Sequence, residues 1–197
     1  MLLHTGIILL PQNHVRKKTA LLDQSFGIIQ GYVQKAYAAG SVIQYHVAPC
    51  VGGGYFINSP QLYYCPIAIA AVDIEFLHHI LELCYFFAPI GSCVNGLFEL
   101  FAALYSSIQS YKTSQAKKYF IFKVLVQLGL WPEAIVFHTE KMIAFAQKPI
   151  ASVVLENIDP ILEKELELWV KYCILQHPRS NLLRTMSFYG KKNTGCK

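Results

Sequence analysis

The hydrophobic pattern of the chain changes at Cys65-Pro66, and this junction constrains the fold more than any other feature. Before it, short apolar runs alternate with polar residues and are broken by glycines and prolines. After it, apolar residues recur every three or four positions over long stretches, which is the period of a helix with one buried face. The sequence therefore predicts an α+β protein, with a small β-domain at residues 1–66, a helical domain at residues 67–190 and a flexible basic tail at residues 191–197.

Five short strands are predicted before the junction. In the third, Ile29, Gly31 and Val33 fall on one side while Gln30 and Tyr32 fall on the other, because side chains alternate along a strand. A small open sheet would expose two unpaired edges, and closure into a barrel removes them. We therefore predict a closed five-stranded barrel, with strands at residues 6–10, 17–23, 26–35, 41–47 and 55–57.

Helical periodicity after the junction predicts a bundle. The stretch at residues 67–90 is the longest apolar one, but it carries acids and histidines and so predicts a buried helix rather than a membrane span. The third helix is apolar on nearly all sides and is expected at the centre, with Lys123 and Gln127 on a solvent-facing seam. Asp159-Pro160 is a favourable start for the last long helix. The predicted helices cover residues 67–88, 96–110, 114–128 and 160–177, with a short basic helix at residues 180–188.

Positive charge is concentrated towards the two ends of the chain. Residues 1–72 carry four lysines and arginines against Asp23 alone, and six basic residues but no acid follow from Trp169 onward, within a net charge of +5. Clustered positive charge attracts polyanions, whereas scattered lysines mainly solvate a surface, and both interpretations stay open. The charge distribution favours a binding protein over an enzyme.

No catalytic or metal-binding pattern is evident. The six cysteines include no Cys-x-x-Cys pair, so neither zinc nor another cofactor is expected. His78 and His79 are adjacent and diverge by about 100° around a helix, which predicts two solvent-facing side chains. We do not expect an enzyme, and a thiol-dependent hydrolase is only a third alternative. The first residues lack the charged segment of a signal peptide, which predicts a cytoplasmic protein.

Basic residues near an aromatic side chain on a barrel surface predict nucleic-acid binding. Lysines neutralise phosphates, and an aromatic ring stacks on bases. Packing of Tyr32 against a neighbouring element is the alternative. The predicted DNA-binding residues are Arg16, Lys17, Lys18, Tyr32, Lys35, Lys112, Arg179, Arg184, Lys191 and Lys192.

The order of elements and several short strings resemble the bacterial recombination mediator RecO family. The opening Thr5-Gly6-Ile7-Ile8-Leu9 and the segment at residues 19–31 are similar to the first three strands of that family's OB barrel. Residues 76–83, 97–100, 120–132, 165–172 and 180–184 are similar to its helical domain. Many members carry a four-cysteine zinc motif that is missing here, and their basic loop is replaced by residues 35–40.

The resemblance implies a non-catalytic function in DNA repair and recombination. Such proteins bind single- and double-stranded DNA, anneal complementary strands and help to load recombinase onto DNA coated by single-strand-binding protein. Their partners are the C-terminal tail of single-strand-binding protein and RecR, on the bacterial nucleoid in the cytoplasm. The alternative is a protein–protein adaptor of RecO-like shape with little affinity for DNA.

An acidic tail that ends in an aromatic residue needs an apolar pocket with a cationic rim. The third predicted helix offers lysines beside aromatic side chains, although core packing explains those aromatics equally well. The pocket for the partner's tail is predicted at Lys117, Lys118, Phe120 and Lys123.

Overall fold

The chain forms two compact units, unit 1 at Met1–Phe98 and unit 2 at Glu99–Lys197. The computed structural model describes residues 2–12, 18–51, 53–94, 96–106, 111, 113–131, 139–148 and 159–185. The barrel and the first helix both belong to unit 1.

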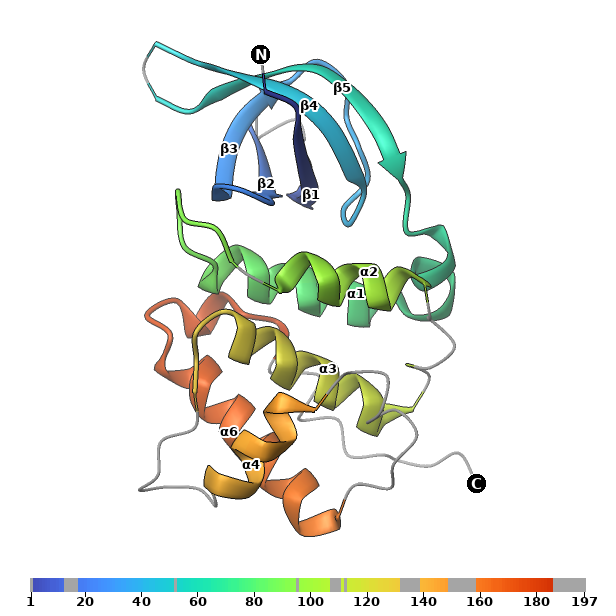
Figure 1. Ribbon diagram of the computed structural model, residues 1–197, viewed down its shortest axis with the longest axis vertical. Coiled ribbons are helices and arrows are strands. Elements are labelled where there is room, and N and C mark those ends of the chain that lie inside the picture. Colours follow the sequence, from blue (N-terminus) through green and yellow to red (C-terminus); the bar gives the residue numbers. More distant parts are fainter. Residues whose placement is uncertain are drawn as a thin grey trace. The chain divides into compact units, whose positions relative to one another are not determined.

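Unit 1 contains a closed five-stranded barrel, which confirms the predicted fold (Figure 1). The strand order is β1-β2-β3-β5-β4, and every pairing is antiparallel except that of β3 with β5. Five strands closed in this way form an OB-like barrel. The strands are β1 His4–Leu10, β2 Thr19–Asp23, β3 Gly27–Val33, β4 Val42–Pro49 and β5 Tyr55–Tyr64.

The barrel core is built from the inward side chains that the alternation predicts. Ile29 and Val33 of β3 pack with Ile57 of β5 in a cluster with Ile8, Leu21, Ile43 and Tyr45. Full burial of one such side chain contributes about 1.5–3 kcal/mol. Gly31 lies where β3 meets β5, and an added Cβ would come within 2.6 Å of Ile57 Cγ1. Glycine at this position therefore allows the two strands to pair.

Helix α1, Ile67–Phe87, follows the junction and contacts β1 and β2. Asp73 interrupts the helix with an extended backbone (φ −159°, ψ 90°), and its Oδ1 accepts a hydrogen bond from the Phe76 amide at 2.9 Å. An aspartate that caps the next turn in this way starts a new helical segment, so the predicted continuous helix has a kink. His78 is exposed as predicted, but the prediction is wrong for His79, which is buried.

Unit 2 is helical, and α3 lies in contact with α4 and α6 (Figure 1). Thr113 accepts a hydrogen bond from the Ala116 amide at the start of α3, and Asp159 accepts one from the Ile161 amide at the start of α6. These side chains satisfy backbone donors that have no partner within the first turn of a helix. The helical elements are α2 Leu97–Ser106, whose first two residues belong to unit 1, α3 Ser114–Gln127, α4 Thr139–Gln147, α6 Pro160–Gln176 and the short 3-10 helix η2 Ser180–Leu182.

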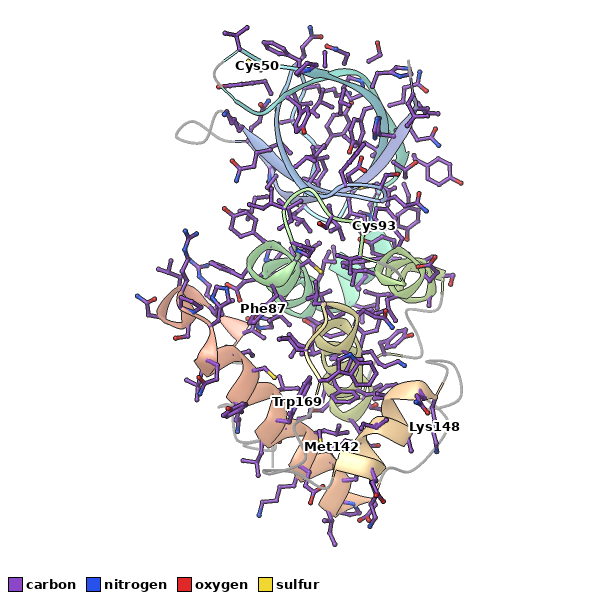
Figure 2. The ribbon with its side chains drawn as sticks, turned by 60° about the vertical axis from the view of Figure 1, so that its left-hand side comes forward. Cys50, Phe87, Cys93, Met142, Lys148 and Trp169 are labelled. Carbon is purple, nitrogen blue, oxygen red and sulfur yellow. The ribbon has the colours of Figure 1, made fainter. Side chains whose placement is uncertain are left out.

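Aromatic side chains fill the core around α3, which confirms that this helix is central to its unit. The Phe122 and Trp169 rings lie 5.0 Å apart between centroids, and the Tyr119 and Phe145 rings lie 4.4 Å apart, both edge to face. Figure 2 labels Trp169 on α6 and Met142 on α4, and both side chains are buried. The predicted basic helix at residues 180–188 begins as η2, and residues 186–188 lie outside the described part of the chain.

Candidate nucleic-acid interface on the barrel

Lys18 and Tyr32, two of the predicted DNA-binding residues, meet on the outer surface of the barrel. The Lys18 Nζ lies 5.1 Å from the centroid of the Tyr32 ring, close enough for a cation–π interaction. The same ammonium donates a hydrogen bond of 3.2 Å to the carbonyl oxygen of Gly53, in the β4–β5 connection. Lys18 is therefore held in place just before β2, beside the aromatic ring.

A second aromatic side chain, Phe56, completes this surface. Parallel pairing sets Tyr32 of β3 opposite Phe56 of β5, and their ring centroids lie 5.8 Å apart with 36° between the planes. Tyr32 remains 36% exposed and Phe56 46% exposed. Tyr32 thus packs against a neighbouring strand and still faces solvent. We call Tyr32 and Phe56 the aromatic pair.

A pocket opens next to the aromatic pair, with a volume of about 310 Å³. Its wall includes Gln30, which lies on the same outward side of β3 as Tyr32, two positions earlier. We call this hollow the barrel pocket. It is lined by Lys18, Ile28, Ile29, Gln30, Gly54, Tyr55, Ile90 and Gly91.

The barrel has one carboxylate, and it is removed from the surface. Asp23 is the sole acid of residues 1–72 and is only 1% exposed. Its Oδ2 accepts a hydrogen bond from the Tyr45 hydroxyl at 2.6 Å and lies 3.2 Å from the His4 Nδ1, while its Oδ1 accepts from the amides of Ser25 and Phe26. Burial, the negative charge of Asp23 and the hydrogen bond to it raise the pKa of Tyr45.

The arrangement leaves the outer face of the strands without a negative charge to offset Lys18. Among the described residues, no carboxylate forms an ion pair with Lys18. Lys35, two residues beyond the end of β3, is exposed. A polyanion approaching the aromatic pair therefore meets cations and no exposed acid on these strands.

Beyond Lys18, Tyr32 and Lys35, two of the predicted DNA-binding residues lie in the described part of the chain. Arg179 and Arg184 are exposed and lie in unit 2, just before and just after η2. The predictions for Arg16, Lys17, Lys112, Lys191 and Lys192 fall outside the described residues.

Two of the four residues predicted to form a pocket for a partner's tail, all of which are described, are buried. Phe120 is fully buried, and Lys123 is only 7% exposed. The Lys123 ammonium donates hydrogen bonds to the carbonyl oxygens of Ala146 and Lys148, so it lies beneath α4 instead of on the expected solvent-facing seam. Burial lowers the pKa of Lys123. Lys117 is half-buried.

Lys118 is engaged by acids of α6. Its Nζ lies 3.0 Å from Glu167 Oε2 and 3.4 Å from Glu163 Oε1. Burial alone lowers the pKa of Lys118, but the hydrogen bonds and charges of Glu167 and Glu163 together outweigh burial and raise it. Lys118 therefore joins α3 to α6, and its charge is already paired.

Sequence reasoning missed Phe56 and the barrel pocket. Phe56 lay within a predicted strand, but its place beside Tyr32 follows only from the parallel pairing of that strand with the third strand. Alternation alone gives the side on which a residue lies, not its neighbour on the next strand.

The chain matches no protein-family model and no curated protein sequence. The resemblance to the RecO family therefore depends on the order of elements and on short strings of sequence. Within the described residues, no helix combines the length and apolar content needed to cross a membrane, and no group of three or more His, Cys, Asp or Glu side chains is placed to hold a metal ion.

Proposed function

We propose that this protein binds single-stranded nucleic acid without catalysis, through the β3–β5 surface of its barrel. The observation that carries the proposal is the exposed aromatic pair of Tyr32 and Phe56 with the ammonium of Lys18 beside it. Bases stack on such rings with about 1–3 kcal/mol each, and lysines neutralise the phosphates between them.

The surrounding structure favours this function over a purely structural role for the rings. Both rings belong to strands of a closed barrel, so their spacing is fixed before a ligand arrives, and the burial of Asp23 removes the acid that would repel phosphates. A preformed surface loses little conformational entropy on binding.

The wider proposal is that of a RecO-like mediator of recombinational repair. An OB-like barrel followed by helices is the order of elements that the resemblance implies. Such a protein binds single- and double-stranded DNA, anneals strands and helps to load recombinase, with single-strand-binding protein and RecR as partners on the bacterial nucleoid. Annealing needs charge neutralisation and alignment of two strands, which requires no catalytic residue.

The test is a fluorescence-anisotropy titration with a labelled single-stranded oligonucleotide at two salt concentrations. Replacing either ring, as Tyr32→Ala or Phe56→Ala, is expected to weaken binding about 5- to 150-fold, the equivalent of one lost stacking contact. Tyr63→Ala is the matched control, because Tyr63 is also an exposed aromatic residue of β5 but lies seven positions beyond Phe56. Equal affinities for the wild type and both pair variants would contradict the proposal.

A protein–protein adaptor is the second candidate, favoured by the outer face of α6. Leu168, Tyr172 and Leu175 are exposed there at the three- and four-residue spacing of one helical face. In this case the acidic tail peptide of single-strand-binding protein is expected to bind the full chain with little salt dependence. Binding that Leu168→Ser and Leu175→Ser both abolish, with no binding of oligonucleotides, would favour the adaptor.

A further inference from the structure

The barrel pocket exists because β3 and β5 pair along only part of their length. Their register starts at Gly31 opposite Tyr55 and ends at Val33 opposite Ile57. Beside the earlier half of β3 runs the segment after α1, where the Ile28 amide donates a hydrogen bond to the carbonyl oxygen of Pro89 and Ile28 forms a bridge with Ile90. The pocket is the space left between this segment and the start of β5.

The pocket wall at Gly54 has room for glycine only. A Cβ added at this position would lie 2.9 Å from the carbonyl oxygen of Gln30 and 3.3 Å from the Lys18 Nζ, and its φ of +91° is one that other residues rarely adopt. The β4–β5 connection therefore approaches β3 closely at the pocket and brings its backbone to the side of Lys18.

The lining combines apolar side chains with a few polar groups. Ile90 is 82% exposed, Tyr55 is the one aromatic residue among those that line the pocket, and Gln30 supplies an amide that both donates and accepts hydrogen bonds. None of the eight lining residues is acidic. A volume of about 310 Å³ lies at the lower end of ligand pockets, so the pocket suits one small ring rather than a stacked pair of bases.

We propose that the barrel pocket receives one unpaired nucleobase of the strand that stacks on the aromatic pair. Gln30 meets the hydrogen-bonding edge of that base, and Lys18, which borders both the pocket and the Tyr32 ring, neutralises the phosphate between the pocketed base and the stacked ones. This inference rests on the proposed function and adds a specificity to it. A base must leave its duplex to enter a pocket, so single strands bind in preference to double strands.

The experiment is an NMR titration of the full chain that follows the backbone amides of Gly54 and Gly91 and the side-chain amide of Gln30. The probes are thymidine 5′-monophosphate and deoxyribose 5-phosphate, which carry the same phosphate but differ in the base. We expect saturable shifts at these three groups with the nucleotide and none with the sugar phosphate. Gln30→Ala is expected to weaken nucleotide binding about fivefold. Gln34→Ala is the control, because Gln34 is also an exposed glutamine but lies four residues further along the chain, just after β3.

Each outcome separates this inference from the proposed function. Equal shifts with both probes would show a phosphate site and overturn the base pocket. If the oligonucleotide binds in the anisotropy titration but the nucleotide shifts no signal in the pocket, the base pocket is overturned while the proposed function of the barrel surface stands. Failure of the oligonucleotide to bind would overturn both. A Tyr32→Ala variant that loses oligonucleotide affinity but keeps the nucleotide shifts would support both.

Discussion

At the scale of single residues, the proposed nucleic-acid interface depends most on Lys18. Its ammonium is fixed by the Gly53 carbonyl and the Tyr32 ring, and no described carboxylate is paired with it. A fixed cation that has no acidic partner can pair with a phosphate without first breaking an ion pair within the protein. This distinguishes Lys18 from Lys118, whose charge is already balanced by α6.

Replacing Lys18 with glutamine is expected to reduce the salt dependence of oligonucleotide binding. Each phosphate contact on a single strand contributes about 0.7 to the slope of log affinity against log salt concentration, so Lys18→Gln should lower the slope by about that amount. Anisotropy titrations across a salt series measure it. Lys18→Arg should keep the wild-type slope, and Lys164→Gln on the exposed side of α6 is the control. Parallel plots for wild type and Lys18→Gln would exclude Lys18 from phosphate contact.

His79 is expected to make the stability of the protein depend on pH. Burial lowers its pKa below the ordinary value, and the nearby acids Glu82, Glu75 and Asp73 offset this effect only in part. Between the two pKa values the unfolded chain binds more protons than the folded one. The contribution of His79 to stability is therefore complete above about pH 6.5 and is lost progressively as the pH falls from there through the lower pKa of the folded state.

Urea unfolding of the wild type and of His79→Gln between pH 7.5 and pH 5 checks this expectation. The free energy of unfolding should fall more steeply with decreasing pH in the wild type than in His79→Gln. His78→Gln is the matched control, since His78 is the exposed neighbour on the same helix and its loss should leave the steep fall in place. Identical pH profiles for wild type and His79→Gln would rule out His79 as the cause.

At the scale of elements, buried polar side chains of α3 hold the end of α4. The Lys123 ammonium donates to the carbonyl oxygens of Ala146 and Lys148, and the Tyr119 hydroxyl donates to those of Phe145 and Lys148. The last carbonyl groups of a helix have no partner within the helix, and a cation near its C-terminus is favourable. These hydrogen bonds explain how the Lys123 ammonium is accommodated in a core of aromatic side chains.

We expect Lys123→Met to loosen the end of α4. Methionine keeps the apolar stem, but the buried carbonyl of Ala146 loses its donor, which costs about 1–3 kcal/mol. Hydrogen–deuterium exchange should become faster in peptides that cover Thr139–Gln147 while exchange in the barrel stays unchanged. Lys141→Met, at an exposed position of α4, is the control. Unchanged exchange in α4 would mean that Lys123 is not needed there.

The sequence predicts where the strands of the barrel lie but not which residues are neighbours on adjacent strands, and the reason is physical. Alternation along β3 is a local signal, and it places Ile29 and Val33 inward and Tyr32 outward, as the structure does. The partnership of Tyr32 with Phe56 depends on closure between strands that are distant in sequence, and no local pattern reports it. The local pattern of α3 likewise predicted Lys123 at the surface, because it carries no information about α4, which covers this residue in the fold.

At the scale of the whole molecule, charge and stacking surface reside in different units. Residues 1–98 carry four basic and four acidic residues, whereas residues 99–197 carry thirteen basic and eight acidic ones and therefore the entire net charge of +5. The aromatic pair and the barrel pocket lie in unit 1. Base contacts are thus expected from unit 1, and long-range attraction of the phosphate backbone mainly from unit 2.

Residues 1–98 produced alone are therefore expected to fold and to bind an oligonucleotide with a shallower salt dependence than the full chain. Folding is expected because the barrel has its own buried core and α1 contacts β1 and β2; circular dichroism and a cooperative urea transition check it. Binding by the fragment should still require Tyr32 and Phe56, because these rings stack on the bases. Its salt dependence should be shallower because counterion release scales with the number of phosphates that lysines and arginines neutralise. A folded fragment with the full salt slope would place every phosphate contact on the barrel unit. A folded fragment with no affinity, beside a full chain that binds, would move the interface to the helices, where Arg179 and Arg184 are the exposed cations to replace next.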